Sequence, residues 1–354
     1  MDLKRFLQAF GYFAIILTLL PFVALDYWWV RIFDFPHIQL TILTLVAFLA
    51  YFFRFDLRSW RDYVFAFILA GCFLFQMGKI YPYTPMAEPE VFNNEETDPQ
   101  DAIGLLSANV LQKNKDTEKL MDVILTFDPD VIVLTETNER WRSEVSSRLK
   151  LRYPYAVEVP LENTYGMLLY SRFRLIDPQV KYLVDDSIPS IHGILEMPSG
   201  AKVEFHSIHP TPPMPQHNPS STDRDAEMMM VAKMARESDL PVLVTGDFND
   251  VAWSQTTSLF KEAGMLLDPR IGRGFYNTFS ANSFIMRWPL DHLFVSADFR
   301  NIELEKARDI GSDHFPLYSK LSLEPKNAKE QAAEHPSKEA LEEANNAIQK
   351  VKRS

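Results

Sequence analysis

The sequence predicts an α/β domain preceded by three transmembrane helices. Two patterns carry this prediction: three long apolar runs lie within residues 1–80, and short apolar strands alternate with helices over residues 101–323. We therefore divide the chain into a three-helix membrane anchor at 1–80, a proline-rich linker at 81–100, a folded domain at 101–323 and a polar C-terminal tail at 324–354.

The composition narrows the class of protein. The chain has 354 residues, of which 47% are hydrophobic and 23% charged, which excludes a disordered or collagen-like protein. Its single cysteine, Cys72, excludes an internal disulfide or a zinc site built from several cysteines. The net charge of −11 disfavours a general nucleic-acid binder, because such proteins are usually basic.

The three apolar runs are Phe6–Leu25, Ile38–Phe55 and Tyr63–Gly78. A bilayer crossing takes about 20 residues, so the first run fits and the other two fit with their flanking residues. A cleavable signal peptide is the alternative for the first run, because Lys4 and Arg5 precede it. No small-residue cleavage site follows, however, and two more runs do. Helices buried in a soluble protein are a second alternative, which three successive all-apolar runs disfavour.

Basic residues in the short loops predict how the anchor is oriented. They cluster before the first run (Lys4 and Arg5) and between the second and third runs (Arg54, Arg58 and Arg61). Placing both clusters in the cytoplasm puts everything after residue 80 on the other side. We therefore expect a multi-pass protein of the plasma membrane or bacterial inner membrane, with the lipid bilayer as partner and an extracytoplasmic domain.

The segments on either side of the folded domain have their own signatures. Four prolines within residues 81–100 indicate an extended, solvated linker. The residues after 324 are rich in Lys, Glu and Ala, which predicts a loose helix or a disordered tail.

Within 101–323 the strands are short and the helices amphipathic. The predicted strands are Ile103–Asn109, Val131–Leu134, Met167–Tyr170, His192–Met197, Lys202–Ile208, Pro241–Thr245, Leu293–Val295 and Pro316–Leu323. Asp116 is positioned to cap a helix whose positions 120, 123, 124 and 127 share one apolar face, and Asp128-Pro129 ends it. Pro198-Ser199-Gly200 indicates a hairpin, and Asp223–Glu237 a methionine-rich helix.

Polar residues stand where these strands end. They are Asn109, Glu136, His209, Asp247 with Asn249, and Asp313 with His314. Strand ends and loops are where a rigid scaffold presents catalytic groups. Carboxylate and amide oxygens suit Mg²⁺, Mn²⁺ or Ca²⁺, and histidines beside carboxylates suit proton transfer or stabilisation of a charged phosphate.

Seven segments carry these residues in a characteristic order. They are Ser107–Val110, Asp130–Thr137, Tyr165–Arg172, Ser207–His209, Thr245–Asn249, Trp288–His292 and Gly311–Pro316. In this order they resemble the endonuclease/exonuclease/phosphatase superfamily, which includes deoxyribonuclease-like nucleases, abasic-site endonucleases, neutral sphingomyelinases and inositol-polyphosphate phosphatases. The resemblance spans nearly all of 101–323. It implies a two-sheet, four-layered α/β sandwich and a metal-dependent phosphoric-ester hydrolase.

The chemistry of phosphate esters suggests which residues bind the metal. Hydrolysis places negative charge on the non-bridging and leaving oxygens, so a divalent cation is needed there. We expect Mg²⁺, with Mn²⁺ possible, on Glu136, with Asn109 and Asp313 assisting. Val110 and Leu111 follow Asn109 where many members of the superfamily carry a second polar residue, which disfavours a second strong metal site.

The remaining site residues are expected to handle protons and charge. Asp247 is the candidate base that deprotonates the attacking water, and Asn249 can donate to a phosphoryl oxygen or to that water. His314 as imidazolium can stabilise the developing charge, and Asp291 would fix its tautomer and raise its pKa. By resemblance, His209 serves in hydrogen bonding or in protonating the leaving group.

Each of these residues also has a purely structural interpretation. Asp247 can cap a turn, Glu136 can lie at a helix N-terminus, and Asn109 can form a strand-end turn. His209 can be a turn residue before Pro210, and residues 312–314 an ordinary loop. Only the joint occurrence of all the motifs in one order favours a catalytic site.

Three functions follow from these patterns. The first is a membrane-anchored, Mg²⁺-dependent phosphoesterase whose substrate is a phospholipid head group, a small phosphodiester or nucleic acid. The second is a nuclease acting on DNA, for which the residues Arg142, Arg148, Lys150 and Arg152 could form a local basic groove. The third is a catalytically idle membrane interaction module, which the intact acid–base set disfavours.

Overall fold

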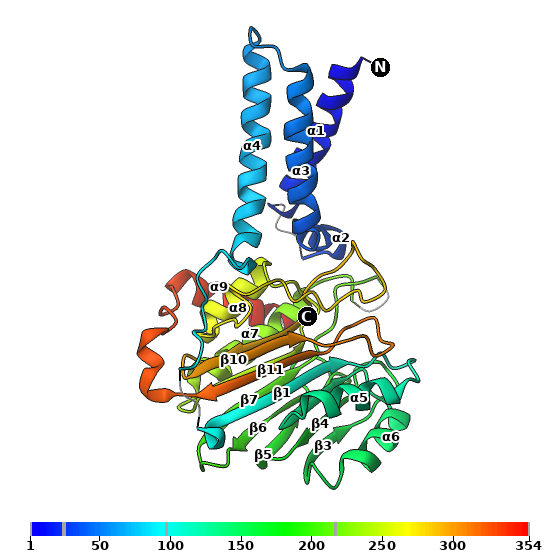
Figure 1. The fold of residues 1–354 in the computed structure, drawn as a ribbon, viewed down its shortest axis with the longest axis vertical. Helices are drawn as coiled ribbons and strands as arrows, with labels where there is room; N and C mark the ends of the chain where they lie inside the picture. The colour runs from blue at the N-terminus through cyan, green and yellow to red at the C-terminus, as the bar shows by residue number, and fades with distance from the viewer. Residues whose placement is uncertain (1, 23–25, 96–97, 216–217, 353–354) are drawn as a thin grey trace.

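The computed structural model describes residues 2–22, 26–95, 98–215 and 218–352. Three long helices stand on one end of a domain built from two sheets (Figure 1). The chain runs down α1, turns through a short helix beside the domain, rises in α3 and returns in α4.

The anchor consists of α1 (Leu3–Leu19), α2 (Trp28–Arg31), α3 (His37–Tyr51) and α4 (Trp60–Ile80). The three expected spans fall on α1, α3 and α4, and the last residues of the first span, 23–25, lie outside the described residues. Two helical stretches, His37–Arg54 and Trp60–Tyr83, are long and apolar enough to cross a membrane, and only 33% of each is buried. The apolar character expected of the anchor is thus supported for two spans.

The helices of the anchor are held together by a small apolar core and by polar links between their side chains. Tyr51 and Leu69 are fully buried in that core. Lys4 of α1 forms an ion pair of 2.6 Å with Asp62 of α4 at the end remote from the domain. At the other end, Gln76 donates to the hydroxyl of Thr18 at 2.5 Å.

The domain contains two mixed sheets. The first has the order β10-β11-β1-β2-β4-β3 and the second β5-β6-β7-β8-β9. The strands are β1 (Ala102–Asn109), β2 (Val131–Thr135), β3 (Tyr155–Val159), β4 (Met167–Ser171), β5 (Arg174–Lys181), β6 (Ser190–Glu196), β7 (Lys202–Ile208), β8 (Val242–Asp247), β9 (Asp291–Val295), β10 (Phe299–Lys306) and β11 (Leu317–Leu323). Their inner faces form the main core.

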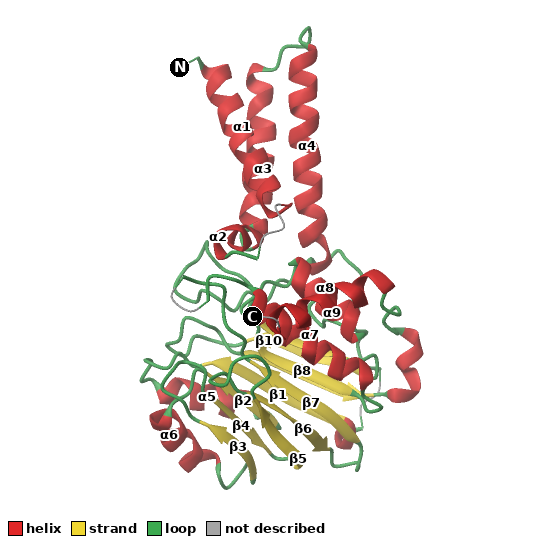
Figure 2. Ribbon diagram, turned by 180° about the vertical axis from the view of Figure 1, so that it is seen from behind, coloured by secondary structure: helices red, strands yellow, loops and turns green. Residues whose placement is uncertain are grey.

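Helices cover the outer face of each sheet, which completes four layers (Figure 2). Helices α5 (Thr117–Phe127) and α6 (Glu139–Leu149) pack on the first sheet. Helices α7 (Thr222–Glu237), α8 (Gln255–Gly264) and α9 (Lys338–Lys352) pack on the second. The expected α/β sandwich is therefore confirmed.

Local sequence signals act as expected in several elements. The side chain of Asp116 accepts a hydrogen bond from the backbone N–H of Lys119, which caps α5. Asp128 takes a left-handed conformation after the last turn, ahead of Pro129, and ends the helix. The hairpin between β6 and β7 forms over residues 197–201.

The segments that flank the domain are more closely packed than their composition suggests. In the expected linker, Val91 is fully buried and the hydroxyl of Tyr83 donates to the carbonyl of Ala252 at 2.6 Å. Residues 338–352 form α9, which packs against α7. Apolar side chains between the prolines, and the apolar stripe of Ala344, Ala347 and Ile348, account for both differences.

Candidate active site

The strand order brings the carboxyl ends of β1, β2, β7 and β8 to one edge of the sandwich. In the parallel pair β7–β8, Ile208 is opposite Gly246, and in β1–β2, Asn109 is opposite Thr135. Polar residues that follow these positions therefore meet. Gly246 has φ 141°, and a Cβ there would lie 2.0 Å from the carbonyl oxygen of Ile208, so only glycine fits.

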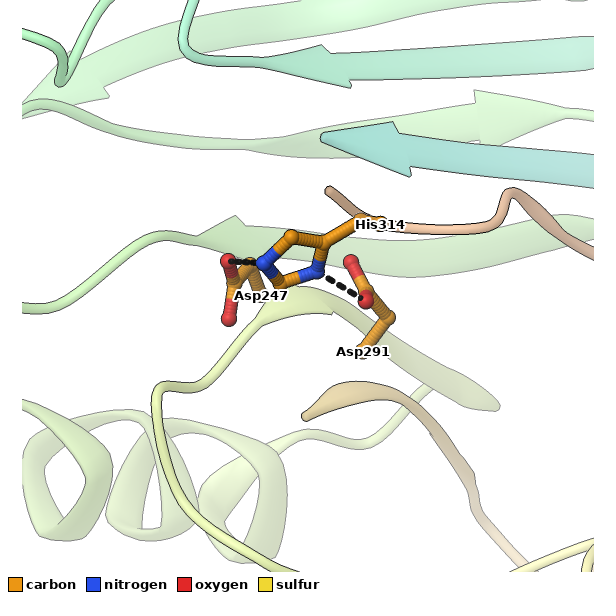
Figure 3. A group of neighbouring side chains, drawn as sticks. All are labelled: Asp247, Asp291 and His314. Atoms are coloured by element: carbon orange, nitrogen blue, oxygen red, sulfur yellow. Dashed lines mark hydrogen bonds and ion pairs between the residues drawn. The ribbon is translucent and has the colours of Figure 1, made fainter. Parts of the chain in front are cut away.

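Asp247, Asp291 and His314 form the buried centre of the site (Figure 3). Asp247 and Asp291 are cross-strand partners on β8 and β9, so their side chains project to the same face. His314 lies between them: its Nδ1 is 2.7 Å from Asp291 Oδ2, and its Nε2 is 3.6 Å from Asp247 Oδ2. The hydroxyl of Ser312 accepts from the backbone N–H of His314 at 3.1 Å and steadies the loop.

The charge of His314 follows from its two carboxylate neighbours. Burial alone would lower its pKa, but the carboxylates of Asp291 and Asp247 outweigh burial and raise the pKa of His314 to about 10. The ring is therefore an imidazolium at neutral pH, with Nδ1–H donated to Asp291 and Nε2–H facing Asp247.

Asn109 links this centre to Glu136. Its Nδ2 donates to Glu136 Oε1 at 2.8 Å and to Asp247 Oδ2 at 2.9 Å. Its Oδ1 accepts from the backbone N–H of Leu111 at 3.0 Å. Glu136 has φ 57° directly after β2, an uncommon conformation that directs its side chain toward Asn109. To offer its oxygen to a metal, Asn109 would have to turn its amide and lose the bond to Leu111.

His209 and Asn249 are also neighbours of Asp247. His209 Nε2 lies 3.8 Å from Asp247 Oδ2, and the ring of Tyr165 packs on the imidazole at 5.3 Å between centroids. Asn249 donates its backbone N–H to Asp247 Oδ1 at 3.0 Å and its side-chain amide to the carbonyl of Pro210 at 3.0 Å. In this arrangement Asn249 holds Asp247 and the loop after β7, rather than presenting its amide to a substrate.

Asp313 has weaker ties to the site than the other residues. Its carboxylate is half-buried and 3.5 Å from the hydroxyl of Ser312, while its carbonyl accepts from the backbone N–H of Ala281 at 2.7 Å. The structure thus brings together Asn109, Glu136, His209, Asp247, Asp291 and His314 by direct contacts. Asp313 is next to them in the chain.

The donor set of the site is suited to a divalent cation. The three carboxylates of Glu136, Asp247 and Asp291 converge there against one imidazolium, which leaves excess negative charge. Oxygen or nitrogen atoms of Asp247, Asp291 and His314 lie within 4.8 Å of one another and could themselves hold an ion. Because both ring nitrogens of His314 already face carboxylates, Glu136 is the more suitable ligand.

Sequence reasoning missed a buried arginine that supports the site. Arg224 of α7, only 1% exposed, donates to the carbonyl of Asn249 at 2.9 Å and lies 3.3 Å from Asp250 Oδ1. It therefore fixes the loop after β8 from outside. The only signal in the sequence is a cation at the start of a helix that also carries buried alanines and methionines. His292 contacts Arg270 and the carbonyl of Asp250 and so has a structural role beside Asp291.

The comparisons with known proteins agree with this fold. The endonuclease/exonuclease/phosphatase family matches residues 106–314. Humanized D. rerio TDP2 superposes with a TM-score of 0.51 at 15% identity, over 63% of this chain and 99% of that one. The human Nocturnin catalytic domain with bound sulfate superposes with a TM-score of 0.51 at 17% identity, over 64% of this chain and 96% of that one. A search of curated proteins found no match.

An endonuclease/exonuclease/phosphatase from Beutenbergia cavernae also superposes with a TM-score of 0.51, at 17% identity over 63% of this chain and 72% of that one. At such identities the solved structures establish the fold alone. The sandwich and its carboxylate–histidine centre define a metal-dependent phosphoric-ester hydrolase. The chain belongs to the endonuclease/exonuclease/phosphatase family.

Proposed function

We propose that the protein is a membrane-anchored, Mg²⁺-dependent phosphoesterase, with Mn²⁺ as an alternative ion. It hydrolyses phosphodiester or phosphomonoester bonds by in-line attack of water. The observation that carries this proposal is the buried set Asp247–His314–Asp291 joined through Asn109 to Glu136. The set combines a base, a fixed positive charge and a carboxylate for a metal.

Glu136 would be the main ligand of the ion, with Asp313 and a reoriented Asn109 assisting. When bound, the ion neutralises charge on the phosphoryl and leaving oxygens. The proposed mechanism needs no second metal ion, because the imidazolium of His314 supplies further positive charge beside the same phosphate.

Asp247 is the proposed base toward the attacking water. Its Oδ1 accepts from the backbone N–H of Asn249 and its Oδ2 from Asn109, so the carboxylate is held in one orientation. Such positioning accounts for much of the rate gain in hydrolysis, because water is bound in the direction of attack. Asp291 holds His314, and His209, whose Nε2 lies 3.8 Å from Asp247 Oδ2, is the candidate for donating a proton to the leaving group.

The exposed surface of the anchor supports a location in the bilayer. Bulky side chains on the outside of the helix bundle stay at least half exposed, among them Phe13, Ile16, Ile42, Leu49, Phe67 and Leu74. An apolar surface of this extent in water is unfavourable and is typical of a lipid-facing segment. We propose that α1, α3 and α4 all cross the membrane of the cell, with α1 completed by residues 20–22.

The orientation proposed for the domain is extracytoplasmic. The N-terminus and the turn between α3 and α4 lie at the end of the bundle remote from the domain (Figure 1). Both basic clusters of the anchor belong to these two segments. Positive charge is enriched in cytoplasmic loops, so the domain end of the bundle is assigned to the opposite side.

The test is hydrolysis by the full chain in detergent, with a panel of DNA, phospholipids and small phosphate esters and with Mg²⁺ or Mn²⁺. Asp247→Asn and His314→Gln should each lower the rate on the order of 10²-fold or more. Asp122→Asn, which changes an exposed carboxylate on α5, is the matched control and should retain activity. Unchanged hydrolysis in both site variants would refute the proposed site.

The panel also separates the alternative functions. Cleavage of duplex DNA at a rate above that of the other esters would favour a nuclease. Absence of hydrolysis of every ester with either ion would favour an idle interaction module.

A further inference from the structure

A cavity of about 710 Å³ opens where the anchor meets the catalytic domain. One wall is the first two turns of α3, with Ile38, Gln39 and Ile42, and the facing wall is the segment 274–287. The side chain of Gln39 donates to the carbonyl of Ile285 at 2.6 Å, which joins the two walls. This part of α3 is the domain end of a candidate span, so the cavity lies at the depth of a bilayer interface.

The rim of the cavity carries a large exposed apolar tip. Phe284 is 94% exposed, Ile285 72% and Met286 51%, at the end of a loop that rises beside α2 and α3 (Figure 1). Three consecutive bulky residues exposed to water are unfavourable, and they are suited to contact with lipid. Trp29 and Ile32 of the neighbouring α2 region are also about half exposed.

Two cations stand at the mouth of the cavity. The guanidinium of Arg287 lies 5.1 Å from the ring centroid of Phe315, and the ammonium of Lys306 lies 4.3 Å from the same ring. Among the described residues neither cation forms an ion pair, although Glu305 also borders the cavity. Within the described part of the chain, Arg287 donates to the carbonyls of Ser283 and Ala281 and to no carboxylate.

The juxtaposition of the two cations has an electrostatic cost. Burial and, after it, the charge of Arg287 lower the pKa of Lys306. The two cations share the ring of Phe315 rather than an acid, in a chain whose net charge is −11. An anion placed between them would remove the repulsion and gain charge-assisted hydrogen bonds.

We propose that this cavity binds one anionic phospholipid of the surrounding bilayer. Its phosphate diester lies on Arg287 and Lys306, and its acyl chains lie along Ile38, Ile42 and Phe284. The apolar wall, the exposed tip and the depth at the membrane interface favour a lipid over a free anion. Because Phe315 directly follows His314, the bound lipid also lies beside one border of the active site.

This inference rests on the membrane anchoring proposed above but not on hydrolysis, so it can fail separately. The first experiment measures lipids retained by the full chain after purification in mild detergent without divalent ions. Vesicles of phosphatidylcholine with phosphatidylglycerol are offered before extraction, and native mass spectrometry counts the bound lipids. One phosphatidylglycerol should remain bound in preference to phosphatidylcholine.

The variant Arg287→Gln with Lys306→Gln should retain phosphatidylglycerol roughly 10- to 30-fold more weakly, because each basic side chain near a membrane contributes to anionic-lipid binding. Arg174→Gln with Lys233→Gln removes the same charge from exposed ion pairs elsewhere and should retain the lipid. Arg287→Lys with Lys306→Arg keeps both charges and should restore retention, which separates loss of charge from loss of folding.

A second experiment uses the unaltered chain. Phosphatidylglycerol with a photoreactive acyl chain should crosslink to residues 284–287 and to the start of α3. Equal retention of phosphatidylcholine, displacement by millimolar inorganic phosphate, or crosslinks confined to the outer surface of the bundle would each overturn the proposal. Membrane extraction with carbonate tests the anchoring itself: a chain that is released has no bilayer from which to take the lipid.

Discussion

At the scale of single residues, the site depends on His314 being held between two carboxylates. Asp291 binds its Nδ1 at 2.7 Å, and Asp247 faces its Nε2 at 3.6 Å. The contact with Asp291 fixes which nitrogen faces the reaction, and the charge of both carboxylates keeps the ring protonated. In the proposed mechanism, His314 therefore acts as a fixed cation and Asp247 as the base.

The variant Asp291→Asn tests this division of roles. The amide has nearly the same shape but carries no charge, so the pKa of His314 should fall and its orientation should be lost. We expect kcat to fall on the order of 10²–10⁴-fold with little change in thermal stability. Measurement of kcat and of the melting temperature for the same preparation separates the two effects. An unchanged kcat would show that His314 needs no anionic partner.

Much of the site could be predicted from the sequence because the polar residues stand directly after apolar strands. Asn109, Glu136, His209 and Asp247 are within one or two positions of a strand end. What could not be predicted is which atoms meet. The amide of Asn249 donates to the carbonyl of Pro210. Arg224 donates to the carbonyl of Asn249 from α7, which belongs to none of the seven motif segments.

At the scale of elements, α7 carries a buried acid that affects stability. Glu227 is 3% exposed, and its Oε1 is without a hydrogen-bond partner among the described residues. Burial, assisted by the charges of Asp185 and Asp223, raises the pKa of Glu227 to about 8. The folded chain thus keeps a proton that the unfolded chain releases at lower pH.

Because the folded chain holds this proton more tightly than the unfolded chain, folding stability falls as the pH rises. The contribution of Glu227 to stability is full below the unfolded pKa of about 4.5 and declines as the pH rises to about 8. Glu227→Gln should abolish this decline and stabilise the chain at pH 9 by roughly 5 kcal/mol relative to the parent, with little change at pH 4. Thermal melts of the parent and the variant at pH 4 and pH 9 measure this difference in stability.

The control is Glu237→Gln on the last turn of the same helix, because that side chain is 60% exposed. It should leave the pH dependence of the melting temperature unchanged. If Glu227→Gln melted like the parent at both pH values, the carboxyl would have to reach water in the native state.

The strands that the sequence predicts are more deeply buried than the strands that it does not predict. Strands β1, β2, β4 and β8 are buried along their whole length and read as continuous apolar runs. Strand β10, which the sequence does not predict, lies at a sheet edge and is buried only in its first three residues. Strands β3 and β5 lie at sheet edges, have no buried residue and contain charged residues and, in β5, Pro178, so no apolar pattern marks them. Backbone pairing with β4 and β6 overrides their weak local signal.

At the scale of the whole molecule, the anchor and the domain form one connected unit. Phe35 and Ile38 from the base of the anchor pack in the same cluster as Trp253, Trp288 and Leu290, next to the site. Tyr27 pairs with Ser220 in the loop that follows β7 and begins with His209. Both loops that border the active site therefore contact the base of the bundle, which places catalysis close to the membrane surface proposed for it.

The proposed topology predicts opposite accessibility of the two ends of the bundle. After Cys72→Ala removes the native thiol, Ser59→Cys marks the turn between α3 and α4, and Ser199→Cys marks a hairpin tip of the domain. In intact cells, a membrane-impermeant thiol reagent should label position 199 and not position 59. The reverse pattern would place the domain in the cytoplasm, and labelling of both would exclude a sealed crossing.

The central claim is that a divalent ion binds where Glu136 meets the Asp247–His314–Asp291 centre. Anomalous diffraction from crystals of the full chain grown with Mn²⁺ tests it most directly. We predict one strong peak in coordination distance of a Glu136 carboxylate oxygen, lost in Glu136→Gln crystals grown in the same way. A peak remote from Glu136, or undiminished hydrolysis after removal of all divalent ions, would contradict the account.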